Sequence, residues 1–138
     1  MKYLNGNLKL AVQKNGRLSE KSIQLLSRCG FDIDNYKDRL IVSARNYELD
    51  VLFLRDDDIP EYVQDGVADI GIVGEDVTHE KGADVNILRK LGFGYCKLMI
   101  AVPENDSLDK IEQLNGKRIA TSYPRILNSY LNENNLNA

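Results

Sequence analysis

Short hydrophobic runs alternate with amphipathic segments along the first half of the chain. Residues 8–12 are apolar and predict a strand, and residues 14–16 predict the turn that follows it. Ile23, Leu25 and Leu26 then recur at the spacing of one helix face. The pattern therefore predicts a strand, a turn and a helix in succession.

Polar and glycine residues mark the ends of the predicted helices. Ser19 is expected to cap the first helix and Gly30 to end it. Asp58, followed three residues later by Glu61, has the spacing of a capping box for a second helix, which Gly66 would end. Both helices therefore have a predicted start and a predicted stop.

Residues 39–44 and 48–54 are rich in Val, Ile and Leu and are separated by a short polar segment, so they predict a hairpin. The further strands are expected at residues 68–73, 86–91, 95–102 and 117–121, and the further helices at residues 108–114 and 123–131. Ile126, Leu127 and Tyr130 are expected to form the apolar face of the last helix.

Strands that alternate with helices indicate an α/β fold with crossover connections. We expect the strand at residues 95–102 to cross between two lobes, so that residues 1–102 form a first α/β lobe and residues 103–138 begin a second one. The second lobe has too few strands for a closed sheet, so we expect it to be incomplete in this chain. Residues 131–138 offer neither a helix cap nor another strand.

The composition is that of an ordinary globular domain. The chain has 138 residues, of which 43% are hydrophobic and 28% charged, enough apolar residues for a real core. No apolar run is long enough to span a membrane and no signal peptide is evident, so we expect a cytoplasmic protein. The net charge of -3 and the scattered basic residues argue against nucleic acid as a partner.

Neither a cysteine metal site nor nucleophilic catalysis by a triad has support in the sequence. Cys29 and Cys96 lack the spacing of a metal site, and we interpret both as reduced packing residues. His79 is the only histidine and has polar neighbours, so we interpret it as a surface residue. No second histidine exists to complete a triad.

Several basic residues stand beside the ends of predicted strands. In open α/β sheets ligands bind outside the carboxyl ends of the strands, and Lys14, Arg17 and Arg55 follow strands there. Arg39 opens its strand and would lie at the opposite end, unless that strand runs antiparallel. Each of these residues taken alone is more often a solvated surface cation. Together they suit phosphate binding.

The acidic run and two glycines each allow two interpretations. Asp56, Asp57 and Asp58 suit Mg²⁺, although helix capping explains Asp58 better, and we assign no metal site held by the protein. Gly71 and Gly74 permit close approach, either of a ligand or of another part of the backbone.

Thr121 and Ser122 stand between a predicted strand and a predicted helix. Their hydroxyl groups are candidates for binding an anionic substrate. A helix-capping role is equally compatible with this position.

Five ordered segments, QKNGRLS, RLIVSA, LRDDDIP, DIGIVGED and GKRIATSYP, resemble the ATP phosphoribosyltransferase family of histidine biosynthesis. The resemblance implies a Mg²⁺-dependent reaction in which N1 of ATP attacks C1 of phosphoribosyl pyrophosphate and pyrophosphate leaves. It also implies a fold like that of type II periplasmic binding proteins, with two lobes around a cleft, and association into homo-oligomers.

The resemblance carries residue roles with it. Lys14, Arg17, Arg39 and Arg55 match the family's basic residues, and we expect Arg17, Arg39 and Arg55 to act on the charge of the transition state and Lys14 to bind substrate. Asp69, Gly71 and Gly74 would line the ATP side of the cleft.

The sequence also departs from the family pattern. The family's sugar-phosphate loop has no counterpart in this chain, nor does the regulatory domain of the long-form enzymes that the QKNGRL spacing resembles. We therefore expect the chain alone to bind ATP or AMP weakly and to show no turnover. Two alternatives remain open: a binding module of the same fold for solutes or small anions, and a partner that completes another chain's active site.

Overall fold

The computed structural model describes residues 6–34 and 36–138. These residues form two compact units that divide between Gly94 and Tyr95. The structure divides the chain earlier than residue 102, the boundary predicted from the sequence, because residues 95–102 do not join the sheet of the first unit. Each unit has its own cluster of buried apolar side chains.

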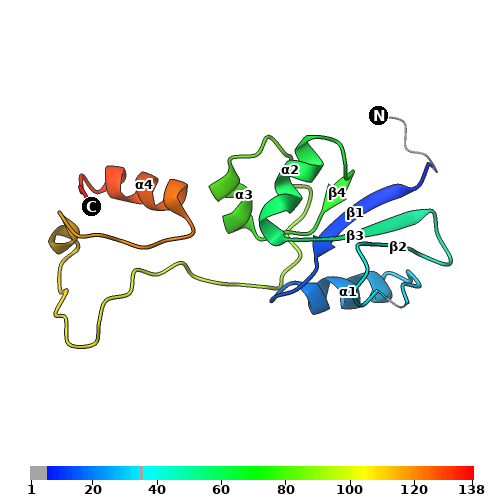
Figure 1. Ribbon diagram of the computed structural model, residues 1–138, viewed down its shortest axis with the longest axis horizontal. Coiled ribbons are helices and arrows are strands. Elements are labelled where there is room, and N and C mark those ends of the chain that lie inside the picture. Colours follow the sequence, from blue (N-terminus) through cyan, green and yellow to red (C-terminus); the bar gives the residue numbers. More distant parts are fainter. Residues whose placement is uncertain (1–5, 35) are drawn as a thin grey trace. The chain divides into compact units, whose positions relative to one another are not determined.

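The first unit is built on a four-stranded sheet with the order β2-β3-β1-β4 (Figure 1). β1 (Leu8–Gln13) pairs in parallel with β3 (Leu49–Leu54) and with β4 (Ile70–Gly71). β2 (Ile41–Ser43) pairs antiparallel with β3. The predicted α/β class and the predicted hairpin are both confirmed.

Helices cover both faces of this sheet (Figure 1). α1 (Ser19–Arg28) packs on one face, and α2 (Ile59–Gln64) packs on the other. A 3₁₀ helix, η1 (Asp56–Asp58), leads directly into α2, and α3 (Glu75–Lys81) lies beside α2. The first unit is therefore a three-layer arrangement of helix, sheet and helix.

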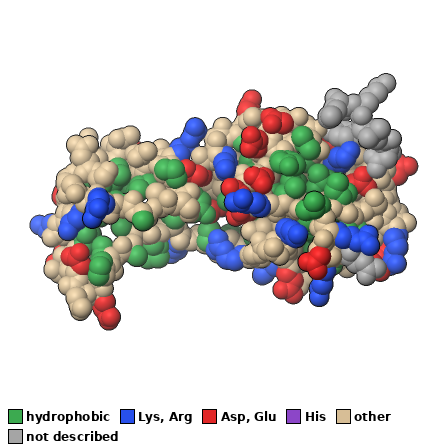
Figure 2. All heavy atoms as spheres, viewed as in Figure 1, with side chains coloured by type: hydrophobic (Ala, Val, Ile, Leu, Met, Phe, Trp, Pro, Cys, Tyr) green, Lys and Arg blue, Asp and Glu red, His purple; other side chains and the backbone are tan. Residues whose placement is uncertain are grey.

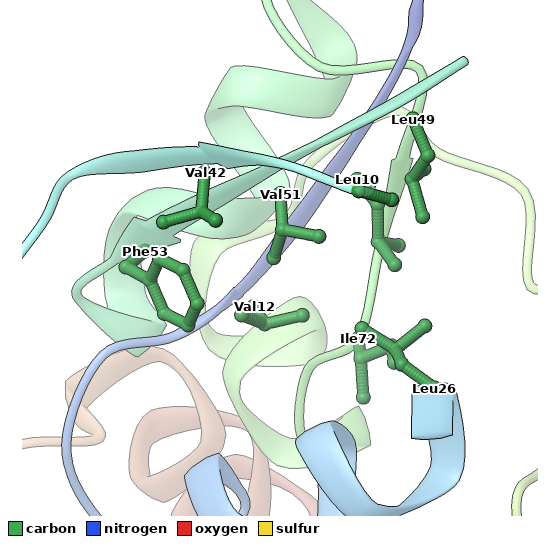
Figure 3. Close-up of a cluster of buried hydrophobic side chains, with 9 residues drawn as sticks. Leu10, Val12, Leu26, Val42, Leu49, Val51, Phe53 and Ile72 are labelled. Atoms are coloured by element: carbon green, nitrogen blue, oxygen red, sulfur yellow. The ribbon is translucent and has the colours of Figure 1, made fainter. Parts of the chain in front are cut away.

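The main core lies between the sheet and α1 (Figure 3). Alternate residues of a strand point to one face, so Leu10 and Val12 of β1 share this face with Val51 and Phe53 of β3. Leu26 of α1 completes the layer. The opposite face of β1 carries Ala11, which packs against α2.

Neither predicted N-terminal cap makes a side-chain capping hydrogen bond, although Asp58 does occupy the N-cap position of α2. The hydroxyl of Ser19 donates a hydrogen bond to the carbonyl oxygen of Lys14 at 3.0 Å, so it serves the preceding turn instead of the helix end. Asp58 makes no cap hydrogen bond, because it is already in the helical region at the end of η1. The predicted stop at Gly30 is confirmed by a φ of 90° and by a hydrogen bond from the Phe31 amide to the Leu26 carbonyl.

The strands predicted at residues 86–91, 95–102 and 117–121 are not formed. Leu88, Tyr95 and Met99 of the first two segments are 79%, 88% and 79% exposed. A strand needs a neighbour to satisfy its backbone groups, and among the described residues neither of these two segments pairs with a strand of the sheet. The apolar pattern alone therefore does not make a strand here.

The second unit contains a short 3₁₀ helix, η2 (Ile111–Leu114), and α4 (Pro124–Glu133). The helix predicted at residues 108–114 is thus shorter than expected, and the helix predicted at residues 123–131 is confirmed. Its buried face differs from the prediction, because Leu131 is buried while Tyr130 is 39% exposed.

The last residues close this small core, contrary to the prediction that they offer no capped finish. Leu136 is 5% exposed, and its amide donates to the carbonyl oxygen of Leu131 at 2.9 Å. Asn135 adopts the left-handed conformation with φ 55°, which is a common way to end a helix. Leu136 then packs with Leu114 and Leu131.

Candidate functional site

The parallel strands β1, β3 and β4 bring their carboxyl ends to one edge of the sheet. Lys14 follows β1 and Arg55 follows β3, and the residues before them, Gln13 and Leu54, are paired in register. The amide of Lys14 donates to the carbonyl oxygen of Leu54 at 2.7 Å. The backbones of these two basic residues are therefore neighbours.

Arg39 lies at the same edge of the sheet, although it precedes its strand β2 instead of following it. β2 is antiparallel to β3, so the residues that precede β2 lie beside the end of β3. The amide of Phe53 donates to the carbonyl oxygen of Leu40 at 2.8 Å, which places Arg39 level with the last residue of β3. The antiparallel condition stated for Arg39 from the sequence is met.

Arg17 lies in the turn that joins β1 to α1. The side chain of Gln13 accepts a hydrogen bond from the Leu18 amide at 3.1 Å, and Ser19 bonds back to Lys14, so the turn is tied to the end of β1. α1 begins here, with the positive end of its dipole at the turn. We call the following four residues the cationic edge: Lys14, Arg17, Arg39 and Arg55.

Two cations of this edge lack a carboxylate partner. Lys14 and Arg39 make no ion pair with any residue that the structure describes. The Arg55 side chain is 80% exposed, and its Nε atom lies 3.5 Å from Oδ1 of Asp57. These charges are open to an anion from solution.

At the opposite edge of the sheet, the charge of Arg45 is compensated by carboxylates. Arg45 donates from Nε and Nη2 to the two oxygens of Asp32, each at 2.9 Å, and also pairs with Asp34. The hydrogen bond from Arg45 holds the pKa of Asp32 below its usual value, with the charge of Arg45 acting in the same direction. The charge of Arg45 is therefore compensated within the protein, whereas Lys14 and Arg39 have no ion pair with the described residues.

Asp69 lies away from the cationic edge, at the start of β4. Its carboxylate accepts a hydrogen bond from the Lys9 amide at 2.7 Å, near the beginning of β1. Gly71 is the last residue of β4 and is paired with Ala11 of β1, and an added Cβ would lie 2.6 Å from Cγ2 of Ile59. Both positions serve the packing and pairing of the sheet.

Gly74 lies beyond the paired residues of β4, three residues after Gly71. Gly74 is the residue before α3, and an added Cβ would lie 2.2 Å from a carboxylate oxygen of Asp76. A tight start of α3 therefore accounts for glycine at this position.

Thr121 and Ser122 belong to the second unit, before α4. Oγ1 of Thr121 accepts a hydrogen bond from the Tyr123 amide at 2.9 Å, which fixes the turn that leads into the helix. Ser122 is exposed. The hydroxyl of Thr121 thus has a local structural partner.

No cluster of three or more His, Cys, Asp or Glu side chains that could hold a metal occurs in residues 6–34 and 36–138. Within the acidic run of η1, Asp57 faces two cations, Arg55 at 3.5 Å and Lys81 at 3.6 Å. His79 is 67% exposed, as expected for a surface residue, and lies 3.8 Å from Glu75.

Lys81 was missed by the sequence reasoning. It is the last residue of α3, where a cation is favoured by the helix dipole whatever its function, so no sequence signal separates it from an ordinary surface lysine. Only the fold shows that it shares the carboxylate of Asp57 with Arg55.

The surface carries both signs of charge. On the face shown in Figure 2, Lys and Arg side chains of the first unit are interspersed with Asp and Glu. Among the helices of the described residues, none is both long enough and apolar enough to cross a membrane. Basic side chains therefore do not dominate this face of the first unit.

Comparisons with known proteins show which family this chain resembles. A family model described as ATP phosphoribosyltransferase matches residues 55–138. The ATP phosphoribosyltransferase of Cytophaga hutchinsonii is 55% identical over 131 residues, and that of Parabacteroides distasonis is 46% identical over 131 residues. Both alignments cover 95% of this chain and 46% of the relative, so the chain spans about half the length of these relatives.

A solved structure is also similar. It is the ATP phosphoribosyl transferase (HisG:HisZ) complex from Thermotoga maritima, with a TM-score of 0.65 and 26% sequence identity. The similarity covers 94% of this chain and 61% of that one. Sequence and fold therefore point to the same family.

Proposed function

Because this chain belongs to the ATP phosphoribosyltransferase family, we propose that its cationic edge holds substrate phosphates for that family's reaction. In this reaction the phosphoribosyl group passes from phosphoribosyl pyrophosphate to N1 of ATP, pyrophosphate leaves, and histidine biosynthesis begins. The observation that carries the proposal is the convergence of Lys14, Arg39 and Arg55 at one edge of the sheet.

The chemistry required of the protein is electrostatic. Breaking the bond between C1 of the sugar and the pyrophosphate moves negative charge onto the leaving group, which fixed cations stabilise. Arg39 and Arg55 can offer forked donors to phosphate oxygens, and Lys14 offers a compact charge. Holding the adenine N1 and the sugar C1 in line supplies the remaining advantage, and no covalent nucleophile is needed.

Magnesium fits this scheme as a companion of the substrates. Mg²⁺ prefers several oxygens and retains water, so it is commonly bound through substrate phosphates and one or two carboxylates. When bound, the ion would neutralise part of the phosphate charge.

We further propose that the complete architecture has two lobes around a cleft, like type II periplasmic binding proteins, and that copies of the full-length protein associate. The similarity to the Thermotoga maritima chain over 94% of this chain supports the first point. The exposed apolar side chains of residues 86–102 are compatible with the second.

The test is a titration of the purified chain with ATP, AMP and phosphoribosyl pyrophosphate, each with and without Mg²⁺, followed by thermal shift and calorimetry. ATP or AMP should raise the melting temperature, since a ligand of the folded state stabilises it. Arg39→Ala should weaken this binding, while Arg28→Ala, at the far end of α1, should not. Stabilisation by amino acids or oxyanions but not by adenine nucleotides would instead favour the solute-binding alternative.

Catalytic turnover is a separate question. We expect none from this chain alone, because it spans 46% of the length of the relatives that it matches. An assay for phosphoribosyl-ATP against a no-enzyme control decides the point, and turnover above the control would contradict the expectation.

A further inference from the structure

One carboxylate beside the cationic edge contacts two cations at once. Asp57, in the middle of η1, places Oδ1 3.5 Å from Nε of Arg55 and Oδ2 3.6 Å from Nζ of Lys81. Arg55 precedes η1 and Lys81 ends α3, so the three residues come from separate elements of the first unit. The carboxylate is therefore a bridge between the end of β3 and α3.

Of the two Asp57 oxygens, Oδ1 lies near Arg55 and is buried. Oδ1 is buried and has no hydrogen-bond partner, so the nearby guanidinium is its compensation. A buried anionic oxygen without a cation is costly, and the same carboxylate restrains the arginine in return. Arg55 is approached at Nε, which leaves its two terminal nitrogens for another anion.

We propose that Asp57 is a positioning residue that aims Arg55 and Lys81, and that Lys81 is a further phosphate-binding cation of the cationic edge. The inference rests on the proposed function, because it takes the phosphates of ATP as the anion. An ion pair 3.5 Å from Nε restrains the guanidinium of Arg55, which lowers the entropy lost when a phosphate binds its terminal nitrogens. The 3.6 Å contact between Lys81 and Asp57 leaves the ammonium hydrogens of Lys81 available to the same ligand.

A purely structural role for Asp57 predicts an effect of opposite sign. If the ion pairs only join η1 to α3, Asp57→Asn removes a negative charge near the phosphates, and ATP should bind more tightly. If Asp57 positions the cations, the same substitution should weaken ATP binding by about fivefold in spite of the favourable change in charge. The sign of the change in Kd therefore separates the two roles.

The experiment uses ATP titrations of the wild-type chain, Asp57→Asn, Lys81→Met and Lys81→Arg. Lys90→Met is the matched control. Lys90 pairs with Glu75 of α3 at 3.1 Å, so this substitution removes one positive charge near α3, as Lys81→Met does. We expect weaker binding in Asp57→Asn and Lys81→Met, recovery in Lys81→Arg, and a Kd near that of the wild type in Lys90→Met. Melting temperatures identify any variant that fails to fold.

A second measurement tests the contact between Arg55 and Asp57 in the absence of ATP. The Nε hydrogen of Arg55 should exchange more slowly in nitrogen-15 NMR spectra of the wild type than in those of Asp57→Asn, because the carboxylate charge of Asp57 lies 3.5 Å from Nε. Unchanged exchange, tighter binding in Asp57→Asn, or equal loss in Lys90→Met and Lys81→Met would each overturn the inference. If the wild-type chain bound no ATP while the exchange still differed, the proposed function would fail and Asp57 would remain the residue that holds Arg55.

Discussion

Both units contain segments rich in apolar residues, but the burial of these side chains differs between the units. In the first unit, Val12 and Val51 are fully buried because each lies in a strand with neighbours on both sides. In the second unit, Tyr95 and Met99 are 88% and 79% exposed in a segment that has no strand partner. The same kind of sequence pattern thus buries its side chains only where another strand is present to pair with it.

The hydrophobic core of the first unit is also larger than that of the second unit. The core of the first unit draws on all four strands and α1, whereas the second unit buries Leu114, Leu131 and Leu136 around two short helices. We therefore expect substitutions to have unequal effects in the two units, and the predictions below follow that order.

The largest effect should come from Phe53→Ala. Phe53 is 3% exposed, stacks on Tyr36 with ring centroids 5.7 Å apart, and would leave a cavity between β3 and α1. We expect a loss of about 3–5 kcal/mol in the free energy of unfolding. Urea unfolding followed by circular dichroism measures it.

Tyr95→Ala is the matched control in the segment without a strand partner. Since Tyr95 is 88% exposed, the change should stay within about 0.5 kcal/mol. Equal losses in Phe53→Ala and Tyr95→Ala would show that residues 95–102 are packed in solution and would remove the contrast between the units.

Leu131→Ala should have a smaller and more local effect. Leu131 is 4% exposed and holds both α4 and the final turn around Leu136. We expect a local destabilisation of about 2–3 kcal/mol. Hydrogen exchange of the α4 amides should accelerate, while the amides of β1 stay protected and those of residues 95–102 exchange rapidly in both proteins. Acceleration in β1 as well would mean that the two units unfold together.

The sequence predicted the parts of the fold whose pattern and partners lie close together in the chain. β1, α1 and the hairpin of β2 and β3 appear close to their expected positions, because each buries one face against a neighbour. The segments at residues 86–91 and 95–102 were wrong as strands, since periodicity reports which side chains are apolar and does not report whether a partner strand exists.

The candidate site shows the same limit. Lys14 and Arg55 could be placed from the rule that ligands bind at the carboxyl ends of strands. Arg39 needed the direction of β2, which only the pairing with β3 reveals. Lys81 and Asp57 are brought together by the packing of α3 beside η1, a contact between elements that no spacing in the sequence indicates.

A further prediction concerns the close packing of β4 in the first unit. Gly71→Ala would place a methyl group 2.6 Å from Cγ2 of Ile59, which is fully buried on α2. Either β4 or α2 must shift, at a cost of about 1–2 kcal/mol. In a double-mutant cycle, Gly71→Ala combined with Ile59→Ala should cost less than the sum of the single changes. Additive losses would show that the contact with Ile59 is not the cause.

The smallest expected effect is on the exposed surface of the first unit, where Arg45 pairs with Asp32. The hydrogen bond and charge of Arg45 lower the pKa of Asp32, so the folded state favours the ionised carboxylate. The stabilisation is therefore present above the unfolded pKa of about 3.9 and is lost as the pH falls through the lower folded pKa. Asp32→Asn should reduce the melting temperature slightly near neutral pH and should match the wild type once both are in strong acid. Since the pair is exposed to solvent, salt should shrink the difference at neutral pH. A difference that persists in acid would assign the effect to the lost hydrogen-bond geometry of Asp32 instead of its charge.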